Sequence, residues 1–228
     1  MSLFAIADTH LSFGTNKPMD TFEGWKNYTE KLKINWNKVV SEKDDVVIAG
    51  DISWAMNFDQ LIPDLKFIES LNGNKIILKG NHDYWWNTLS KMNRMLEEND
   101  LKTIKFLHNN SYIVNNISVC GSRGWMFEND EVVDEKVLAR EVMRVRRSLE
   151  TADCADKLVF LHYPPVTANS VCEEIMHLLN EFGIKKCFFG HLHGEGAKYV
   201  REGNIEGIDF KLISCDRLNF TPYLINKY

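Results

Sequence analysis

Short apolar runs recur along this chain, and each of them stops at polar residues. They cover residues 3–7, 46–49, 76–78, 158–161 and 187–189. Continuous apolar runs of this length are typical of strands buried on both faces. Longer stretches between them carry apolar residues at three- and four-residue spacing, which predicts helices near residues 22–40, 58–71, 84–97, 132–149 and 171–182. The alternation of the two patterns predicts an α/β fold.

Two further segments predict antiparallel strands. Residues 112–114 and 117–120 flank an Asn-Asn pair and predict a hairpin. Residues 199–200, 205–215 and 223–225 predict a strand meander near the carboxyl end. We therefore expect mixed sheets. The 228 residues contain no repeat and no Pro/Gly/Ser-rich linker, so we expect one domain over residues 1–228.

Composition excludes several classes of protein. No apolar run approaches the roughly 18 residues of a membrane span, and no secretory signal pattern is found at the amino terminus. The five cysteines form no C-x-x-C pair, which indicates reduced thiols and predicts a cytoplasmic protein. The lack of a long apolar run predicts no membrane partner. A net charge of -5 argues against general nucleic-acid binding, since such binding depends on basic surface.

The residues that follow the predicted buried strands share metal-binding chemistry. They are Asp8 and His10 after the first strand, Asp51 after the second, Asn81, His82 and Asp83 after the third, His162 after the fourth, and His191 and His193 after the fifth. Ligands of open α/β sheets bind outside the carboxyl ends of the strands, so we expect these residues to converge on one crevice. The other two histidines, His108 and His177, are interpreted as an exposed loop residue and a helix-face residue.

The ordered series D-x-H, G-D, G-N-H-D, H and G-H-x-H, spread over residues 8–193, resembles the calcineurin-like metallophosphoesterase superfamily. The resemblance implies two mixed β-sheets packed as a sandwich and flanked by helices. It implies a first metal ion held by Asp8, His10, Asp51 and His193, and a second held by Asp51, Asn81, His162 and His191. It also implies that His82 is the catalytic histidine near the leaving group and that Asp83 orients it.

The donor set agrees with this resemblance. Imidazole, amide and carboxylate ligands suit two divalent transition metal ions of the Mn, Fe, Zn or Co type, whereas Mg²⁺ and Ca²⁺ prefer oxygen ligands alone. Two such ions lower the pKa of a shared water and clamp phosphoryl oxygens. We therefore expect a phosphoester hydrolase that uses a metal-bridging hydroxide, with the choice between monoester and diester substrates open.

Two alternatives belong to other classes. A non-catalytic binding module of the same fold would lack part of the catalytic set, and the presence of His82 beside every expected ligand argues against it. A nuclease would be expected to carry a basic surface or an added DNA-binding region, and the charge of -5 leaves little room for either. The residues do not indicate an oligomeric state.

Aromatic and basic residues near the expected site have two interpretations each. Trp54, Trp85, Trp86 and Trp125 either pack the sheet-helix junctions or, with Trp54 foremost, form an aromatic wall for a flat substrate group. Arg123 lies between Gly121 and Gly124 in a loop, and we expect its guanidinium to contact substrate phosphate. One face of a predicted helix carries a stripe of basic residues, namely Arg140, Arg144 and Arg147 with Arg146 beside them. This stripe is either a solvated face or a binding site for a second phosphate or a partner.

Overall fold

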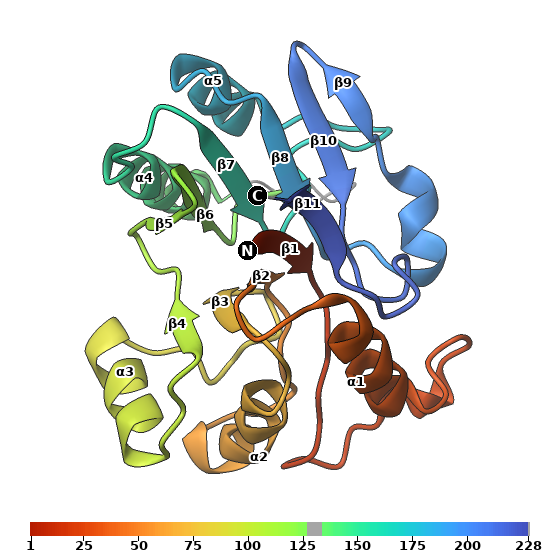
Figure 1. Cartoon of the computed structure of the whole chain (residues 1–228). Coiled ribbons are helices and arrows are strands. Elements are labelled where there is room, and N and C mark those ends of the chain that lie inside the picture. The colour runs from red at the N-terminus through yellow and green to blue at the C-terminus, as the bar shows by residue number, and fades with distance from the viewer. Residues whose placement is uncertain (127–133, 228) are drawn as a thin grey trace.

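The computed structural model describes residues 1–126 and 134–227. Two β-sheets pack face to face, and helices cover the outer face of each sheet (Figure 1). The predicted α/β fold with two mixed sheets is therefore confirmed. No helix in the described part of the chain has the length and apolar composition needed to cross a bilayer.

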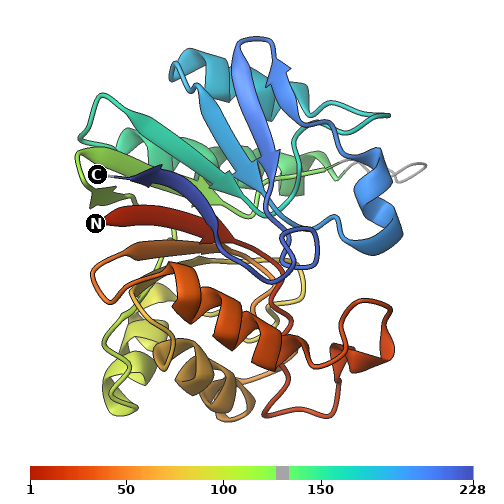
Figure 2. The same ribbon diagram turned by 45° about the vertical axis from the view of Figure 1, so that its right-hand side comes forward.

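The first sheet has four parallel strands and one antiparallel strand. Its order is β11 (Tyr223–Lys227), β1 (Ser2–Ile6), β2 (Asp45–Ala49), β3 (Asn74–Leu78) and β4 (Ile104–Phe106). Because β1 pairs with β11, the two chain ends lie side by side (Figure 2). The outer face of this sheet packs against α1 (Tyr28–Val39), α2 (Phe58–Glu69) and α3 (Leu89–Glu98).

The second sheet has a parallel centre and antiparallel edges. Its order is β5 (Tyr112–Val114), β6 (Ile117–Ser122), β7 (Lys157–Leu161), β8 (Lys186–Phe189), β10 (Ile208–Leu212) and β9 (Gly203–Ile205). Its outer face packs against α4 (Glu135–Glu150) and α5 (Glu173–Glu181). Short 3-10 helices cover Met19–Thr21 (η1) and Gly194–Tyr199 (η2).

Burial on both faces explains why the strands lack an alternating pattern. In β1, Phe4 and Ile6 pack on the helix side, in one cluster with Trp36 of α1. Leu3 and Ala5 pack on the opposite side, against apolar residues of the second sheet. Folding removes both sets of side chains from contact with water, so apolar residues are favoured on both faces of the strand.

Several predicted boundaries were wrong at the start of helices. The helix expected over residues 22–40 begins at Tyr28, after Asn27 in the left-handed region (φ 56°). The helix expected over residues 84–97 begins at Leu89, because the residues after β3 form the loop that carries part of the candidate site. The helix expected over residues 132–149 begins at Glu135, and residues 132–133 lie outside the described residues.

The strand predictions also needed correction near the carboxyl end. Residues 199–200 form no strand, because Tyr199 ends η2 and Val200 makes an isolated bridge to Thr167. The run expected over residues 205–215 is divided by a turn at Glu206 and Gly207, both with positive φ. The three-residue strand β4 was missed, since its Lys105 breaks the apolar run.

Candidate metal centre

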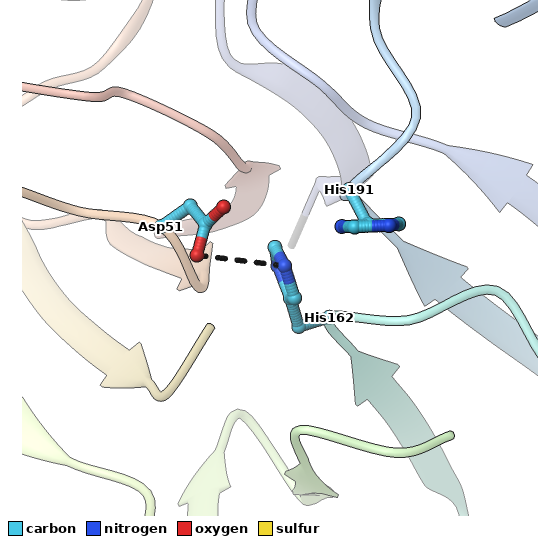
Figure 3. A group of neighbouring side chains, drawn as sticks. All are labelled: Asp51, His162 and His191. Atoms are coloured by element: carbon cyan, nitrogen blue, oxygen red, sulfur yellow. Dashed lines mark ion pairs between the residues drawn. The ribbon is translucent and has the colours of Figure 1, made fainter. Parts of the chain in front are cut away.

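Loops from both sheets bring the predicted ligands together at one edge of the sandwich. The side chains of Asp51, His162 and His191 come from the loops after β2, β7 and β8 (Figure 3). Asp51 Oδ1 lies 3.5 Å from His162 Nε2, and Asp51 Oδ2 lies 3.8 Å from His10 Nε2. Residues that are up to 183 positions apart, such as Asp8 and His191, are thus neighbours.

Two groups of ligand-type side chains share one carboxylate. Asp8, His10 and Asp51 form the first group, and Asp51, His162 and His191 form the second, with the ligand atoms of each within 4.8 Å of one another. The other two predicted ligands lie beside these groups. Asn81 Oδ1 is 2.6 Å from His162 Nε2, and the His193 ring centre is 5.4 Å from that of His10. The Asp51 carboxylate is therefore common to both groups.

The backbone at the site adopts conformations that L-residues seldom take. Asp8, His10, Asp51 and His191 have φ values of 59°, 43°, 51° and 71°. Left-handed conformations cost about 1–3 kcal/mol each at non-glycine residues and persist where the surroundings enforce them. The neighbouring Gly80 is required by space, since a Cβ there would lie 2.1 Å from Asp51 Oδ1. The fold therefore holds these loops in a fixed arrangement at an energetic cost.

Burial shifts the titration of both kinds of ligand toward their neutral forms. It lowers the pKa of His10 well below the usual range, and lowers those of His162 and His191 to about 3. It raises the pKa of Asp51 to about 6, and burial together with the charge of Asp51 raises that of Asp8. Imidazoles must be neutral to bind a metal ion, and a divalent cation relieves the cost of burying two carboxylates.

The hydrogen bonding of His162 supports a cation at this position. Its Nδ1 lies 3.1 Å from the Ala49 carbonyl oxygen, which accepts only, so the proton of the neutral ring is on Nδ1. Its Nε2 lone pair then faces two further acceptors, Asn81 Oδ1 and Asp51 Oδ1. A metal ion satisfies such a group of acceptors without a donor.

His10 provides a second observation of the same kind. Both of its ring nitrogens are buried and have no hydrogen-bond partner among the described residues. A buried polar atom without a hydrogen-bond partner lowers the stability of the fold unless a ligand or an ion binds to it. The residues present therefore fit a site for two metal ions.

His82 lies at the exposed side of this group. Its side chain is 33% exposed, and its Nε2 is 4.0 Å from Asp51 Oδ2. Its backbone N–H donates to Asp51 Oδ1 over 2.8 Å, which fixes the loop next to the expected bridging ligand. The ring is thus placed beside the ligands while remaining accessible from outside.

Asp83 is a buried residue that links two loops of the site. No hydrogen bond joins Asp83 to the His82 ring in the described part of the chain. Instead, the buried Asp83 carboxylate accepts hydrogen bonds from four backbone N–H groups and from the indole N–H of Trp85. The backbone donors are Asp51, Ile52, Ser53 and Gly80. It ties the loop after β2 to the loop after β3, which carries His82.

A cavity of about 550 Å³ opens beside the candidate metal centre. His10, His82 and His193 line it on one side, and Trp25 and Trp54 line it with other residues. Trp54 stacks on His10 with ring centres 4.8 Å apart, and its ring lies 4.5 Å from that of His82. Trp25 was not identified from the sequence, because it follows no strand and lies within a segment that was expected to be helical.

The other tryptophans differ in their surroundings. Trp85 is buried and bonded to Asp83, and Trp86 stacks on His108 and donates to its Nδ1 over 2.7 Å. Trp125 packs against the hydrophobic core of the second sheet. His108 is therefore half-buried rather than an exposed loop residue, whereas His177 lies exposed on α5 as expected.

Arg123 lies apart from the cavity beside the metal centre. Its guanidinium is 2.9 Å from the buried Glu141 carboxylate and lies over the Tyr163 ring. Within the basic stripe, the Arg144 guanidinium donates a hydrogen bond to the same Glu141 oxygen over 2.5 Å. Arg146 forms an ion pair with Glu181 of α5. Arg140 is exposed and donates to a carbonyl of its own helix.

Comparison with known families agrees with this geometry. The family model for calcineurin-like phosphoesterases matches residues 1–195. The chain belongs to this family. The matched region contains every predicted metal ligand from Asp8 to His193.

One curated protein is similar to part of the chain. The uncharacterized protein MJ1445 of Methanocaldococcus jannaschii is 31% identical over 120 residues, which is 50% of this chain. The alignment covers 62% of that relative, less than two thirds of its length.

Solved structures share the fold at low sequence identity. The phosphopantetheinyl hydrolase PptH of Mycobacterium tuberculosis has a TM-score of 0.61 at 14% identity, with 100% of this chain and 96% of that chain covered. The protein AQ665 of Aquifex aeolicus, of unknown function, has a TM-score of 0.54 at 16% identity, with 98% and 95% covered. At these identities, the likeness concerns the fold alone.

Proposed function

We propose that this protein hydrolyses phosphoesters with two divalent transition metal ions of the Mn, Fe, Zn or Co type. The observation that carries the proposal is the shared carboxylate of Asp51, which belongs to both groups of ligand-type side chains. A dinuclear site of this kind binds an anionic phosphoryl group even in a protein with a net charge of -5. The free cysteines fit a reducing compartment, for which we propose the cytoplasm.

Each ion has four ligands in this proposal. Asp8, His10, Asp51 and His193 hold the first ion; Asp51, Asn81, His162 and His191 hold the second. When bound, the ions lower the pKa of a shared water and withdraw charge from the phosphoryl oxygens. The protein contributes the fixed loop geometry and the neutral state of the His162 and His191 imidazoles.

His82 donates a proton to the leaving oxygen in this proposal. It lines the cavity and is one third exposed, so a substrate in the cavity can reach its ring. A general acid contributes about 10²- to 10⁴-fold to the rate and is needed most by a strongly basic leaving group. Asp83 acts as a positioning residue through the backbone of Asp51.

The cavity walls support a leaving group with an apolar or aromatic part. Trp54 presents aromatic surface next to His10, and the buried Trp25 packs edge-on against His10 and His193, which belong to the proposed ligand set. Stacking on such surface is worth about 1–3 kcal/mol per base. The phosphopantetheinyl activity of the M. tuberculosis neighbour adds one specific ester to the substrates worth testing.

A phosphoester panel tests the proposed function. The purified chain would be loaded with Mn²⁺ and assayed on p-nitrophenyl phosphate, bis-p-nitrophenyl phosphate, cyclic nucleotides, phosphopeptides and a phosphopantetheinyl ester. We expect the chain to hydrolyse at least one of these esters, EDTA to abolish the activity and Mn²⁺ to restore it. The Asp51→Asn variant should lose both its bound metal and its activity. A metal-loaded protein without activity on any phosphoester would contradict the proposal and favour a non-catalytic binding module. Hydrolysis of DNA in preference to small esters would favour a nuclease.

A further inference from the structure

A second, smaller pocket lies at the same edge of the sandwich as the candidate metal centre. It is lined at the carboxyl ends of β3, β4 and β6 and by α4, and it measures about 50 Å³. A cavity needs about 10–15 Å³ to hold one water molecule, so this pocket has room for several waters or a small anion. Its polar lining residues are Lys79, His108, Asn109, Ser122, Arg123 and Arg144.

The charge of this pocket is positive. Lys79, Arg123 and Arg144 line it, and Glu141 is the carboxylate that pairs with the two arginines. Both guanidinium groups contact the same oxygen, Glu141 Oε1, so one negative charge faces two positive ones. No carboxylate of the described residues lies within ion-pair distance of Lys79. The pocket therefore concentrates positive charge in a chain whose net charge is -5.

Unused hydrogen-bond donors accompany this charge. Arg123 Nε is buried and has no hydrogen-bond partner among the described residues. His108 Nδ1 accepts from Trp86 Nε1, which can only donate, so the neutral His108 ring carries its proton on Nε2. Burial and the charges of Arg144 and Lys79 lower the pKa of His108, which keeps this ring neutral near pH 7. Glu141 Oε2, on the residue that pairs with both arginines, is also buried without a partner, so one free acceptor accompanies these donors. Free donors together with a surplus of positive charge are what the binding of an oxyanion requires.

Two backbone connections join the pocket to the candidate metal centre. Lys79 precedes Asn81 by two residues. The Arg123 carbonyl oxygen accepts the backbone N–H of His162 over 3.0 Å. A ligand in the pocket therefore lies beside the loops that carry two of the proposed metal ligands.

We propose that this pocket is a binding site for a phosphate-type oxyanion, separate from the metal centre. Arg144 of α4, which is 44% exposed, and Lys79 after β3 provide charged donors, and the Arg123 guanidinium is held by Glu141. The anion is either a second phosphate group of the substrate or free inorganic phosphate. The first of these sources rests on the proposed function, whereas the site itself does not.

Phosphate titration of the metal-stripped full-length chain tests the site. Inorganic phosphate would be titrated by isothermal calorimetry into wild type, Arg144→Ala, Lys79→Ala and, as matched control, Arg140→Ala, with circular dichroism to verify folding. Arg140 lies one helical turn away, is exposed and does not line the pocket. We expect wild type and Arg140→Ala to bind one phosphate, and the two pocket variants to bind it about tenfold or more weakly, as the loss of a charged hydrogen bond implies.

Absence of phosphate binding by folded wild type, or equal affinity in all four proteins, would overturn the proposal. Arg144→Ala could instead lower the thermal stability without changing the phosphate affinity. That result would show that the arginines only stabilise the packing of α4 against the loop after β6, and it would also overturn the proposal. This titration does not depend on activity, so it separates the proposed pocket from the proposed function.

Kinetics of the metal-loaded proteins identify the source of the anion. If the pocket binds a second phosphate of the substrate, Arg144→Ala raises KM for esters that carry a second phosphate group and leaves KM for p-nitrophenyl phosphate unchanged. If the pocket binds free phosphate, KM is unchanged for both classes and the phosphate affinity alone falls. Each result, together with a positive titration, supports the site.

Discussion

At the scale of single residues, replacing His82 distinguishes a proton donor from a residue that only stabilises charge. If it donates a proton to the leaving group, His82→Ala keeps the metal content and loses about 10²- to 10⁴-fold on alkyl phosphates, but much less on p-nitrophenyl esters. The reason is that p-nitrophenolate leaves without protonation. A leaving-group series on the metal-loaded variant measures this, and an equal loss on all esters would assign His82 an electrostatic role instead.

Trp54 tests whether the aromatic wall selects the substrate. Its ring stacks on His10 and lines the cavity, so Trp54→Ala should raise KM for nucleotide or aromatic esters about 5- to 150-fold, which corresponds to the stacking energy of about 1–3 kcal/mol. Small alkyl phosphates should be affected much less, and Trp54→Phe should restore part of the affinity. Equal loss on both classes together with a lower Tm would show that Trp54 serves packing.

The pH dependence of metal binding follows from Asp51. Because burial raises its pKa to about 6, this carboxyl group in the metal-free protein holds a proton below that pH, and a metal ion must displace it. His162 and His191, with pKa values of about 3, stay neutral and add no such competition. Mn²⁺ affinity measured by calorimetry should therefore fall as the pH drops below about 6, and the proton on Asp8, whose pKa is raised as well, adds to this loss. Constant affinity between about pH 5 and pH 7 would contradict this assignment.

The residue types at the strand ends could be predicted from sequence because each motif is local. Asp8, Asp51, Asn81 and His162 were identified in this way, and the structure brings them together. The role of Asp83 could not be predicted, since its hydrogen bonds run to residues about 30 positions away. Trp25 was missed for the same physical reason: its contacts with the rings of His10 and His193 are tertiary.

At the scale of elements, β3 and α2 are joined by a buried lysine. Lys75 Nζ donates to the carbonyl oxygens of Leu71 and Gly73 over 2.7 and 2.8 Å, just after α2 ends at Glu69. Burial lowers its pKa to about 8, so the ammonium group remains largely charged at neutral pH. This lysine secures the turn between α2 and β3, which was not apparent from a sequence in which β3 was expected to start at residue 76.

Lys75→Met should therefore destabilise the protein. It leaves two buried carbonyl groups without their donor, which costs about 1–3 kcal/mol in the free energy of unfolding. Urea denaturation measures this, with Lys66→Met on the exposed face of α2 as the matched control. Unchanged stability of Lys75→Met would show that water replaces the lysine at these carbonyl groups.

Element boundaries were harder to predict than element types. The parallel strands β1, β2, β3, β7 and β8 all occur where the apolar runs place them. The starts of α1 and α3 do not, because left-handed residues and loop hydrogen bonds delay them. Turn residues such as Glu206 and Gly207 divide β9 from β10, although the apolar pattern continues through them.

At the scale of the whole molecule, the sandwich brings the carboxyl ends of strands from two sheets to one edge. This places Asp51 from the first sheet against His162 and His191 from the second, so the candidate metal centre joins the two sheets (Figure 3). The prediction that residues 1–228 form one domain stays a prediction. The central claim is that Asp51 bridges two metal ions.

Anomalous X-ray scattering from crystals grown with Mn²⁺ tests this claim most directly. We expect two anomalous peaks about 3.5–4 Å apart, one on each side of the Asp51 carboxylate. Asp51→Asn crystals grown in the same way should show neither peak at full height. One peak alone, or two peaks of which neither lies within coordination distance of Asp51, would contradict the account.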